Sequence, residues 1–222
     1  MKARVHSLRV GTPEIHTGTL GEWTTALLKK EQKGEVWARF DNLDGDRQAD
    51  LKHHGGVDKA ICVYPLAHYD YWNGRLGVHW KPGDFGENLT VEGQTEKCVA
   101  VGDVFEIGES VVEVTQPRSP CWKIARLHGI KELALYVQET GFTGWYLRVL
   151  REGPIRAGSS IVAKGTGMPR ITIEKANLIA YADHNPAPLL ECSALSQGWR
   201  RKFEEKLRSG EISDFSKRLY GH

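Results

Sequence analysis

The sequence has no closely spaced pair of cysteines. Its cysteines are scattered through 222 residues, and no two of them form a CxxC pair. This spacing disfavours a structural zinc site and a thioredoxin-type redox pair, and it excludes a plant-type iron–sulfur cluster. Free thiols are the simplest expectation, as in a reducing compartment. The four residues are Cys62, Cys98, Cys121 and Cys192.

Long apolar runs are missing as well. No stretch approaches the ~20 apolar residues that a membrane-spanning helix needs. The opening segment, residues 1–11, is polar and has no apolar core of signal-peptide length. We therefore expect a cytoplasmic protein that does not associate with a membrane.

An excess of charge of one sign is also absent. Lys and Arg together number 30 and Asp and Glu 28, so the formal net charge is only +2. No global field attracts nucleic acid, and we expect no stable nucleic-acid partner. Local groups of Lys and Arg can still bind a small anion. The composition, 40% hydrophobic and 26% charged, is that of a globular protein with one substantial core.

Short β-type segments fill the first 165 residues, separated by Gly, Pro and Asp. Many short strands at this spacing are typical of a barrel or a sandwich. Residues 105–114 predict a hairpin that turns at residues 108–110. The other strands are expected at residues 3–11, 35–40, 60–65, 88–93, 97–108, 145–150 and 160–165.

Helical patterns occur in two places within this β-rich region. Residues 64–74 predict a helix with Gly74 as its stop, and residues 129–141 predict a second helix that ends at Gly141.

From residue 168 onward the pattern becomes entirely helical. Thr172 is a plausible N-cap, and the last predicted helix, residues 197–210, ends at Gly210. We expect a β-rich domain of residues 1–167 and a helical domain of residues 168–222. The second is too short for a large core of its own, so it should dock on the β domain or on a partner.

A polar loop surrounds a glycine pair, Gly55 and Gly56. Paired glycines let backbone N–H groups approach an anion closely. His54 precedes the pair, and Asp58 and Lys59 follow it, so Lys59 can add a point charge for a phosphate. A tight turn with solvated charges is the alternative interpretation.

A second loop places Glu87 and Asn88 directly before a strand, after Gly86. Gly86 permits unusual backbone dihedral angles. The Asn88 amide can donate and accept, which suits a heterocyclic ligand. It can equally bond its neighbouring backbone.

The third loop contains Cys121, which follows Pro120 at the end of a predicted strand. An isolated cysteine is often a small buried hydrophobe, and Cys62 fits that description in an apolar run. Cys121 differs because Arg118 and Lys123 flank it, and positive charge favours the reactive thiolate. Rigid backbone, charge and thiol coincide here, which favours a functional cysteine.

Taken together and in this order, the three loops resemble the MOSC domain, the C-terminal domain of molybdenum cofactor sulfurases. The matching motifs are GDRQAD…HHGGVDKAICVYP, FGENL and QPRSPCWKI. The closest likeness is to the YiiM branch, and it extends into the tail GWRRKFEEKLRSGEISDFSKRLYG, so it covers nearly the whole chain.

The resemblance implies a mainly β fold with helices, namely a MOSC-type β-barrel with peripheral helices and a small C-terminal three-helix domain. It also implies a bound molybdenum cofactor, a phosphate-bearing pterin dithiolene. Cys121 matches the cysteine that ligates the molybdenum, and with His54 it forms the expected catalytic pair. The residues expected around the cofactor are His54, Gly55, Gly56, Asp58, Lys59, Glu87, Asn88, Arg118 and Ser119.

The activity implied by the resemblance is reduction of N-hydroxylated compounds such as 6-hydroxylaminopurine, with His54 or Glu87 as a proton source. The chain has no room for a fused ferredoxin domain, so a separate reductase, for which a flavoprotein is a candidate, should supply electrons. Neither is a pyridoxal-phosphate desulfurase domain fused to it. Two alternatives stay open, a cofactor carrier without turnover and a persulfide carrier at Cys121. A homodimer also stays open.

Overall fold

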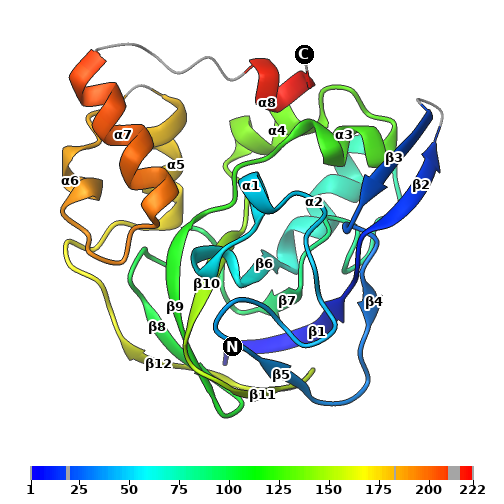
Figure 1. Ribbon diagram of the computed structural model, residues 1–222, viewed down its shortest axis with the longest axis horizontal. Coiled ribbons are helices and arrows are strands. Elements are labelled where there is room, and N and C mark those ends of the chain that lie inside the picture. The colour runs from blue at the N-terminus through cyan, green and yellow to red at the C-terminus, as the bar shows by residue number, and fades with distance from the viewer. Residues whose placement is uncertain (1, 19–20, 183, 210–215, 222) are drawn as a thin grey trace.

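This computed structural model describes residues 2–18, 21–182, 184–209 and 216–221. In this part of the chain, eight strands form one curled sheet in the order β12-β8-β9-β10-β6-β7-β1-β4 (Figure 1). Their segments are rich in β-branched and aromatic residues, which pack well on a pleated surface. The strands are β1 (Arg4–Val10), β4 (Lys30–Glu31), β6 (Ile61–Pro65), β7 (Leu89–Glu92), β8 (Val104–Ile107), β9 (Ser110–Pro117), β10 (Trp145–Arg151) and β12 (Ile161–Gly165).

The curled sheet brings β1 next to the start of β12. The N–H of Val5 donates to the carbonyl of Ser159 at 2.9 Å, and the N–H of Ile161 donates to the carbonyl of Ala3, also at 2.9 Å. These bonds join the two strands across the curl. The structure thus confirms a mainly β fold with peripheral helices.

One pair of neighbouring strands, β6 and β7, runs parallel. Parallel neighbours need a crossover, and helix α2 (Ala67–Leu76) lies between these two strands in the chain. The predicted stop of this helix at Gly74 is wrong. The helix passes Gly74 and ends at Gly77, whose φ of 66° is the left-handed conformation that closes many helices.

The predicted hairpin of residues 105–114 is confirmed by the antiparallel pairing of β8 with β9. The strand predicted for residues 97–108 is too long, because β8 begins only at Val104. Just before it, the Asp103 carboxylate accepts the backbone N–H of Ala100 at 2.8 Å. This local bond holds a turn where the apolar pattern predicted a strand.

Two small sheets flank the large one. Strands β5 (Val36–Ala38) and β11 (Gly153–Ile155) form one of them. Strands β2 (Glu14–Gly18) and β3 (Gly21–Thr25) form the other, a hairpin that projects from the body of the molecule (Figure 1). The sequence analysis did not predict this hairpin.

Helices cover the end of the barrel next to that hairpin. They are α1 (Leu51–His54), a 3-10 turn (Val57–Lys59), α3 (Trp122–His128) and α4 (Leu133–Thr140), which ends at Gly141 as predicted. Of these, α3 and α4 enclose a second, largely aromatic core together with α2. Its buried members are Tyr64, Tyr69, Trp72, Phe85, Ile124, Ala125, Leu133 and Val137.

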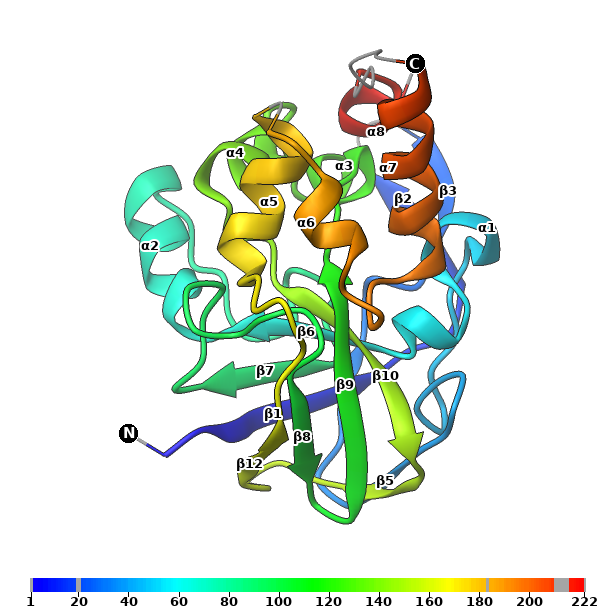
Figure 2. The same ribbon diagram turned by 90° about the vertical axis from the view of Figure 1, so that its left-hand side faces the viewer.

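The C-terminal helices α5 (Ile173–Tyr181), α6 (Ala187–Leu190) and α7 (Gln197–Ser209) gather at one end of the barrel, beside β9 (Figure 2). Thr172 caps α5 as predicted, because its hydroxyl accepts the backbone N–H of Lys175. The predicted stop at Gly210 lies outside the described residues. A short helix, α8 (Ser216–Tyr220), follows.

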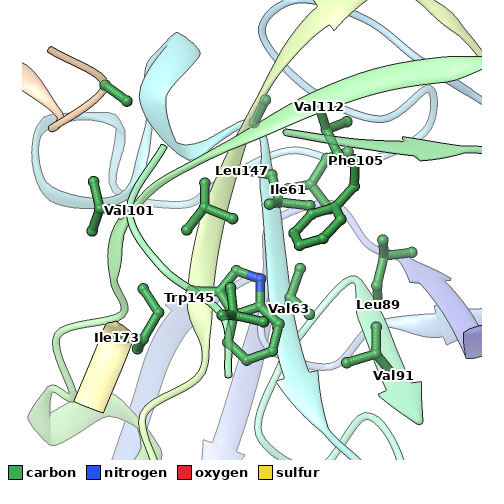
Figure 3. Packing of buried hydrophobic residues seen from close by; sticks show 14 of the residues in the cluster. Ile61, Val63, Leu89, Val91, Val101, Phe105, Val112, Trp145, Leu147 and Ile173 are labelled. Atoms are coloured by element: carbon green, nitrogen blue, oxygen red, sulfur yellow. The ribbon is translucent and has the colours of Figure 1, made fainter. Parts of the chain in front are cut away.

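These helices and the barrel share one apolar core. Figure 3 shows Ile173 of α5 beside Val101 and Trp145. Phe203 of α7 belongs to the same buried cluster. The helical appendage therefore docks on the β domain.

No helix in the described ranges has both the length and the apolar character needed to cross a membrane.

Candidate functional site

An open cavity of about 70 Å³ lies where the barrel meets α1, α3 and the end of the β2–β3 hairpin. Five of the residues predicted for the site line it, although they come from four separate segments of the chain. They are His54, Lys59, Asn88, Arg118 and Cys121.

Cys121 occupies the N-cap position of α3 in an extended conformation, with φ −134°. Its side chain is half-buried at the cavity wall. The Sγ atom lies 3.9 Å from Nε2 of His54. The predicted strand-to-helix transition at this cysteine is confirmed, and the structure brings the predicted catalytic pair together.

Arg118 is the most enclosed cation at the cavity, with 8% of its surface exposed. Its backbone N–H donates to the carbonyl of Gly144 at 3.1 Å. Within the described part of the chain, no hydrogen bond or ion pair reaches its guanidinium. A buried charge without a partner is costly, so this residue is suited to an anionic group of a ligand.

Other cations surround the cavity. Burial lowers the pKa of Lys59. Lys123 forms an ion pair with Asp50 at 2.9 Å. Lys29 forms a buried ion pair with Asp46.

His54 is held neutral by this environment. Burial, followed by the charges of Lys123 and Arg118, lowers the pKa of His54 from 6.5 to about 3. At neutral pH the ring is therefore not an imidazolium acid. It can still accept a proton on one nitrogen while it donates from the other.

Asn88 lines the cavity, but its amide already has partners in the barrel. Its Oδ1 accepts the backbone N–H of Cys62 at 3.0 Å, and its Nδ2 donates to the carbonyl of Arg9 at 3.2 Å. The structure thus favours a role for Asn88 in tying three strands together beneath the cavity.

Five predicted residues do not line the cavity. The Asp58 carboxylate binds Arg148 at 2.8 Å and caps the backbone N–H of Gln197 at 2.9 Å. Ser119 accepts a hydrogen bond from the hydroxyl of Tyr181 at 3.2 Å. Gly55 and Gly56 also lie outside the lining, and the N–H of Gly55 donates to Leu51 within α1.

Glu87 also lies away from the cavity lining. It is fully buried, and its Oε1 accepts from the hydroxyls of Tyr69 and Thr90 at 2.6 Å and from the N–H of Gly83 at 2.8 Å. These bonds organise the loop before β7. The structure gives Glu87 no place from which it could protonate a ligand directly.

Cys62 and Tyr146 are among the cavity residues that were not predicted from the sequence. Cys62, interpreted in the sequence analysis as a core residue, is buried but lines the cavity, and it lies opposite Tyr146 in the β6–β10 pairing. Burial raises the pKa of both side chains, so both are protonated at neutral pH. Only the pairing of β6 with β10 shows that their side chains meet, because apolar runs do not reveal which face of a sheet borders a cavity.

Comparison with known proteins agrees with the three motifs. A model of the MOSC domain matches residues 50–162, and a model of the YiiM-like 3-alpha helix domain matches residues 171–210. The crystal structure of YiiM from Geobacillus stearothermophilus superimposes with a TM-score of 0.78 at 33% identity, covering 92% of this chain and 99% of that chain.

Sequence relatives extend over most of the chain. An uncharacterized Bacillus subtilis protein, YflK, is 43% identical over 206 residues, which cover 91% of this chain and 93% of that protein. A protein of Gibberella moniliformis named a reductase is 31% identical over 195 residues, covering 85% of this chain but 34% of that protein. The chain belongs to the MOSC-domain family, in the branch that carries a YiiM-like 3-alpha helix domain.

Proposed function

We propose that this protein holds a molybdenum cofactor in the cavity and uses it to reduce N-hydroxylated compounds such as 6-hydroxylaminopurine. The observation that carries the proposal is the presence of Cys121 and the unpartnered Arg118 in one cavity. A thiol is a soft metal ligand, and a guanidinium suits an anionic group such as phosphate. MOSC domains are associated with binding of this cofactor.

The chemistry of the cavity residues fits such a ligand. Arg118 and Lys59 offer positive charge in the same cavity as the thiol of Cys121. Cys121 would ligate the metal, and Arg118 and Lys59 would hold the anionic part. When bound, the molybdenum would supply a centre that exchanges two electrons and accepts oxygen.

The overall reaction converts R–NHOH, two electrons and two protons into R–NH₂ and water. The N–O bond breaks, the nitrogen compound is reduced, and the electron donor is oxidised. A separate reductase, for which a flavoprotein is a candidate, supplies the electrons. The reductase name of one longer relative supports a redox role.

The residues of this chain would handle the protons. His54 is neutral and lies beside Cys121, so it is suited to relay a proton to the departing oxygen without carrying a permanent charge. The raised pKa of Tyr146 keeps its phenol protonated, which makes it a hydrogen-bond donor at the same wall.

Turnover with an artificial electron donor tests the proposal without the natural reductase. Protein from a cofactor-competent host is mixed with dithionite-reduced methyl viologen and 6-hydroxylaminopurine, and adenine is measured by chromatography against a protein-free blank. We expect adenine from the parent protein and at least a hundredfold less from Cys121→Ala. Cys98→Ala, which removes an exposed thiol outside this cavity, is the matched control and should behave like the parent.

The outcomes separate the candidate functions. A cofactor-loaded parent that forms no adenine would point to a carrier without turnover. A parent without cofactor that accepts sulfur on Cys121 from a persulfide donor would point to the sulfur-carrier alternative. Equal turnover by Cys121→Ala would contradict the role of Cys121.

A further inference from the structure

The carboxylate of Asp46 is only partly satisfied, although it is completely buried at the cavity lining. Its Oδ1 accepts the backbone N–H of Gly11 at 2.8 Å and pairs with the ammonium of Lys29. Its Oδ2 is enclosed and has no hydrogen-bond partner among the described residues. All protein donors thus gather on one oxygen, and the other is left free.

Leaving such an oxygen without a hydrogen-bond donor costs free energy. A buried acceptor without a donor loses the hydrogen bonds that water gave it, and the loss is larger for a charged group. A carboxylate oxygen can accept more than one hydrogen bond. Lys29 neutralises the net charge of Asp46, but it does not satisfy Oδ2. A donor from a bound ligand would satisfy this oxygen, which no donor among the described residues reaches.

The Asp46 carboxylate belongs to the same cavity as the cations. Arg118, Lys59 and Asp46 all line that cavity. The cavity therefore combines a cationic region with one buried acceptor. A matching ligand carries an anionic group and, elsewhere, an N–H group.

We propose that Oδ2 of Asp46 accepts a hydrogen bond from an N–H group of the nitrogen heterocycle bound in this cavity. The inference rests on the proposed function, which gives the N–H two sources, the pterin of the cofactor or the purine-type substrate. In either case Asp46 is a binding residue that recognises an N–H group on the edge of the heterocycle. Neither Asp46 nor Lys29 was predicted as a site residue from the sequence.

Asp46→Asn tests this idea with little change in size. The amide can keep its oxygen toward the N–H of Gly11, which requires an acceptor, so that its NH₂ group replaces Oδ2. A donor then faces the donor of the ligand. Glu87→Gln is the matched control, because it also replaces a buried carboxylate that has one oxygen without a partner among the described residues, but Glu87 lies outside the cavity lining.

The measurements are pterin and molybdenum per polypeptide, the KM and kcat for 6-hydroxylaminopurine, and the melting temperature of cofactor-free protein. If the pterin supplies the N–H, we expect pterin content to fall about tenfold or more in Asp46→Asn and to stay at the parent level in Glu87→Gln. If the substrate supplies it, cofactor content should be equal in all proteins, and KM should rise about tenfold or more in Asp46→Asn alone.

The inference would be overturned if both variants shifted the melting temperature equally while their pterin content and KM matched those of a cofactor-loaded parent. The proposed function would then stay intact. A parent with no cofactor and no turnover would overturn both. If Asp46→Asn does not fold, the double variant Lys29→Gln with Asp46→Asn removes both charges of the pair together and is compared with the parent and with Glu87→Gln. Parent-like cofactor content and KM in that double variant would also overturn the inference.

Discussion

Gly86 lines the cavity in a sterically constrained position. Its φ is +71°, and an added Cβ would lie 2.5 Å from Cδ2 and 3.2 Å from Cα of Leu27. We expect Gly86→Ala to lower the free energy of unfolding by about 1–3 kcal/mol, from backbone strain and from displacement of Leu27. Urea denaturation measures the change.

Gly74 provides the control for that substitution. It lies inside α2, and an added Cβ would meet no atom within 4 Å. Gly74→Ala should be neutral or stabilising, by up to about 1 kcal/mol, because alanine favours a helix. Equal effects of the two substitutions would contradict the close approach of Gly86 to Leu27.

His54 should make stability depend on pH. Its pKa is about 3 in the folded protein against 6.5 ordinarily. Between these values the unfolded chain binds a proton on His54 and the folded protein does not, so stability is complete above pH 6.5 and is lost as pH falls toward 3. We expect cofactor-free parent to lose at most about 1.4 kcal/mol more per pH unit than His54→Gln over that range.

Urea denaturation of both proteins at pH 7 and pH 5 measures this difference. Identical losses in parent and His54→Gln would show that burial and the surrounding positive charges do not hold His54 neutral.

Individual cavity residues could be predicted where neighbouring residues in the sequence already indicated a functional site. Cys121 and Arg118 stood out because thiol, charge and proline-restricted backbone coincide in a few residues, and the structure places both at the cavity. Asp58 and Glu87 are equally polar in sequence, but their partners Arg148 and Tyr69 lie in other segments. Such long-range partners decide whether a carboxylate is structural, and local sequence does not reveal them.

At the scale of elements, the β2–β3 hairpin supplies a side of the cavity through residues 24–27. Trp23 attaches it to α3, with its ring 6.0 Å from that of Trp122 and the guanidinium of Arg126 5.4 Å from the Trp23 ring. The hairpin is largely exposed, so its apolar pattern is weak. This weak pattern is one reason why the sequence did not predict the hairpin. The other is that its main contact lies on a helix that is distant in the chain.

Removing that attachment should loosen the hairpin. We expect Trp23→Ala to lower the free energy of unfolding by about 3 kcal/mol and to speed proteolytic cleavage within residues 14–25. Ile15→Ala is the control, because Ile15 lies on the same hairpin with 71% of its surface exposed, and it should change stability by no more than about 0.5 kcal/mol. Unchanged proteolysis of Trp23→Ala would contradict this role of Trp23.

For the whole molecule, the shared core makes the barrel and the C-terminal helices interdependent. Phe203 of α7 is 1% exposed and belongs to the same cluster as Trp145 of the barrel. We expect Phe203→Ala to cost about 3–5 kcal/mol and to weaken amide-exchange protection in β9 as well as in α7. Leu207→Ala, on the exposed side of the same helix, should do neither.

Loss of protection confined to α7 would contradict that coupling and would indicate a helical domain that unfolds by itself.

The overall architecture was largely predictable, because strand and helix patterns agree with the three motifs along nearly the whole chain. The order of strands in the sheet was not, since it depends on pairings such as that of β1 with β7, whose residues are far apart in sequence. The same limit applies to the cavity. Tyr146 and Asp46 meet Cys121 and His54 there only because the sheet curls.

The most direct test of the central claim is the molybdenum and pterin content of protein from a cofactor-competent host. Parent, Cys121→Ala and the control Cys98→Ala are purified in parallel, and metal per polypeptide is measured by mass spectrometry. We expect stoichiometric molybdenum in the parent and in Cys98→Ala, and loss of most of it in Cys121→Ala. Equal molybdenum in Cys121→Ala and the parent would remove Cys121 from the ligand role, and no molybdenum in any of them would contradict a molybdenum cofactor in this cavity.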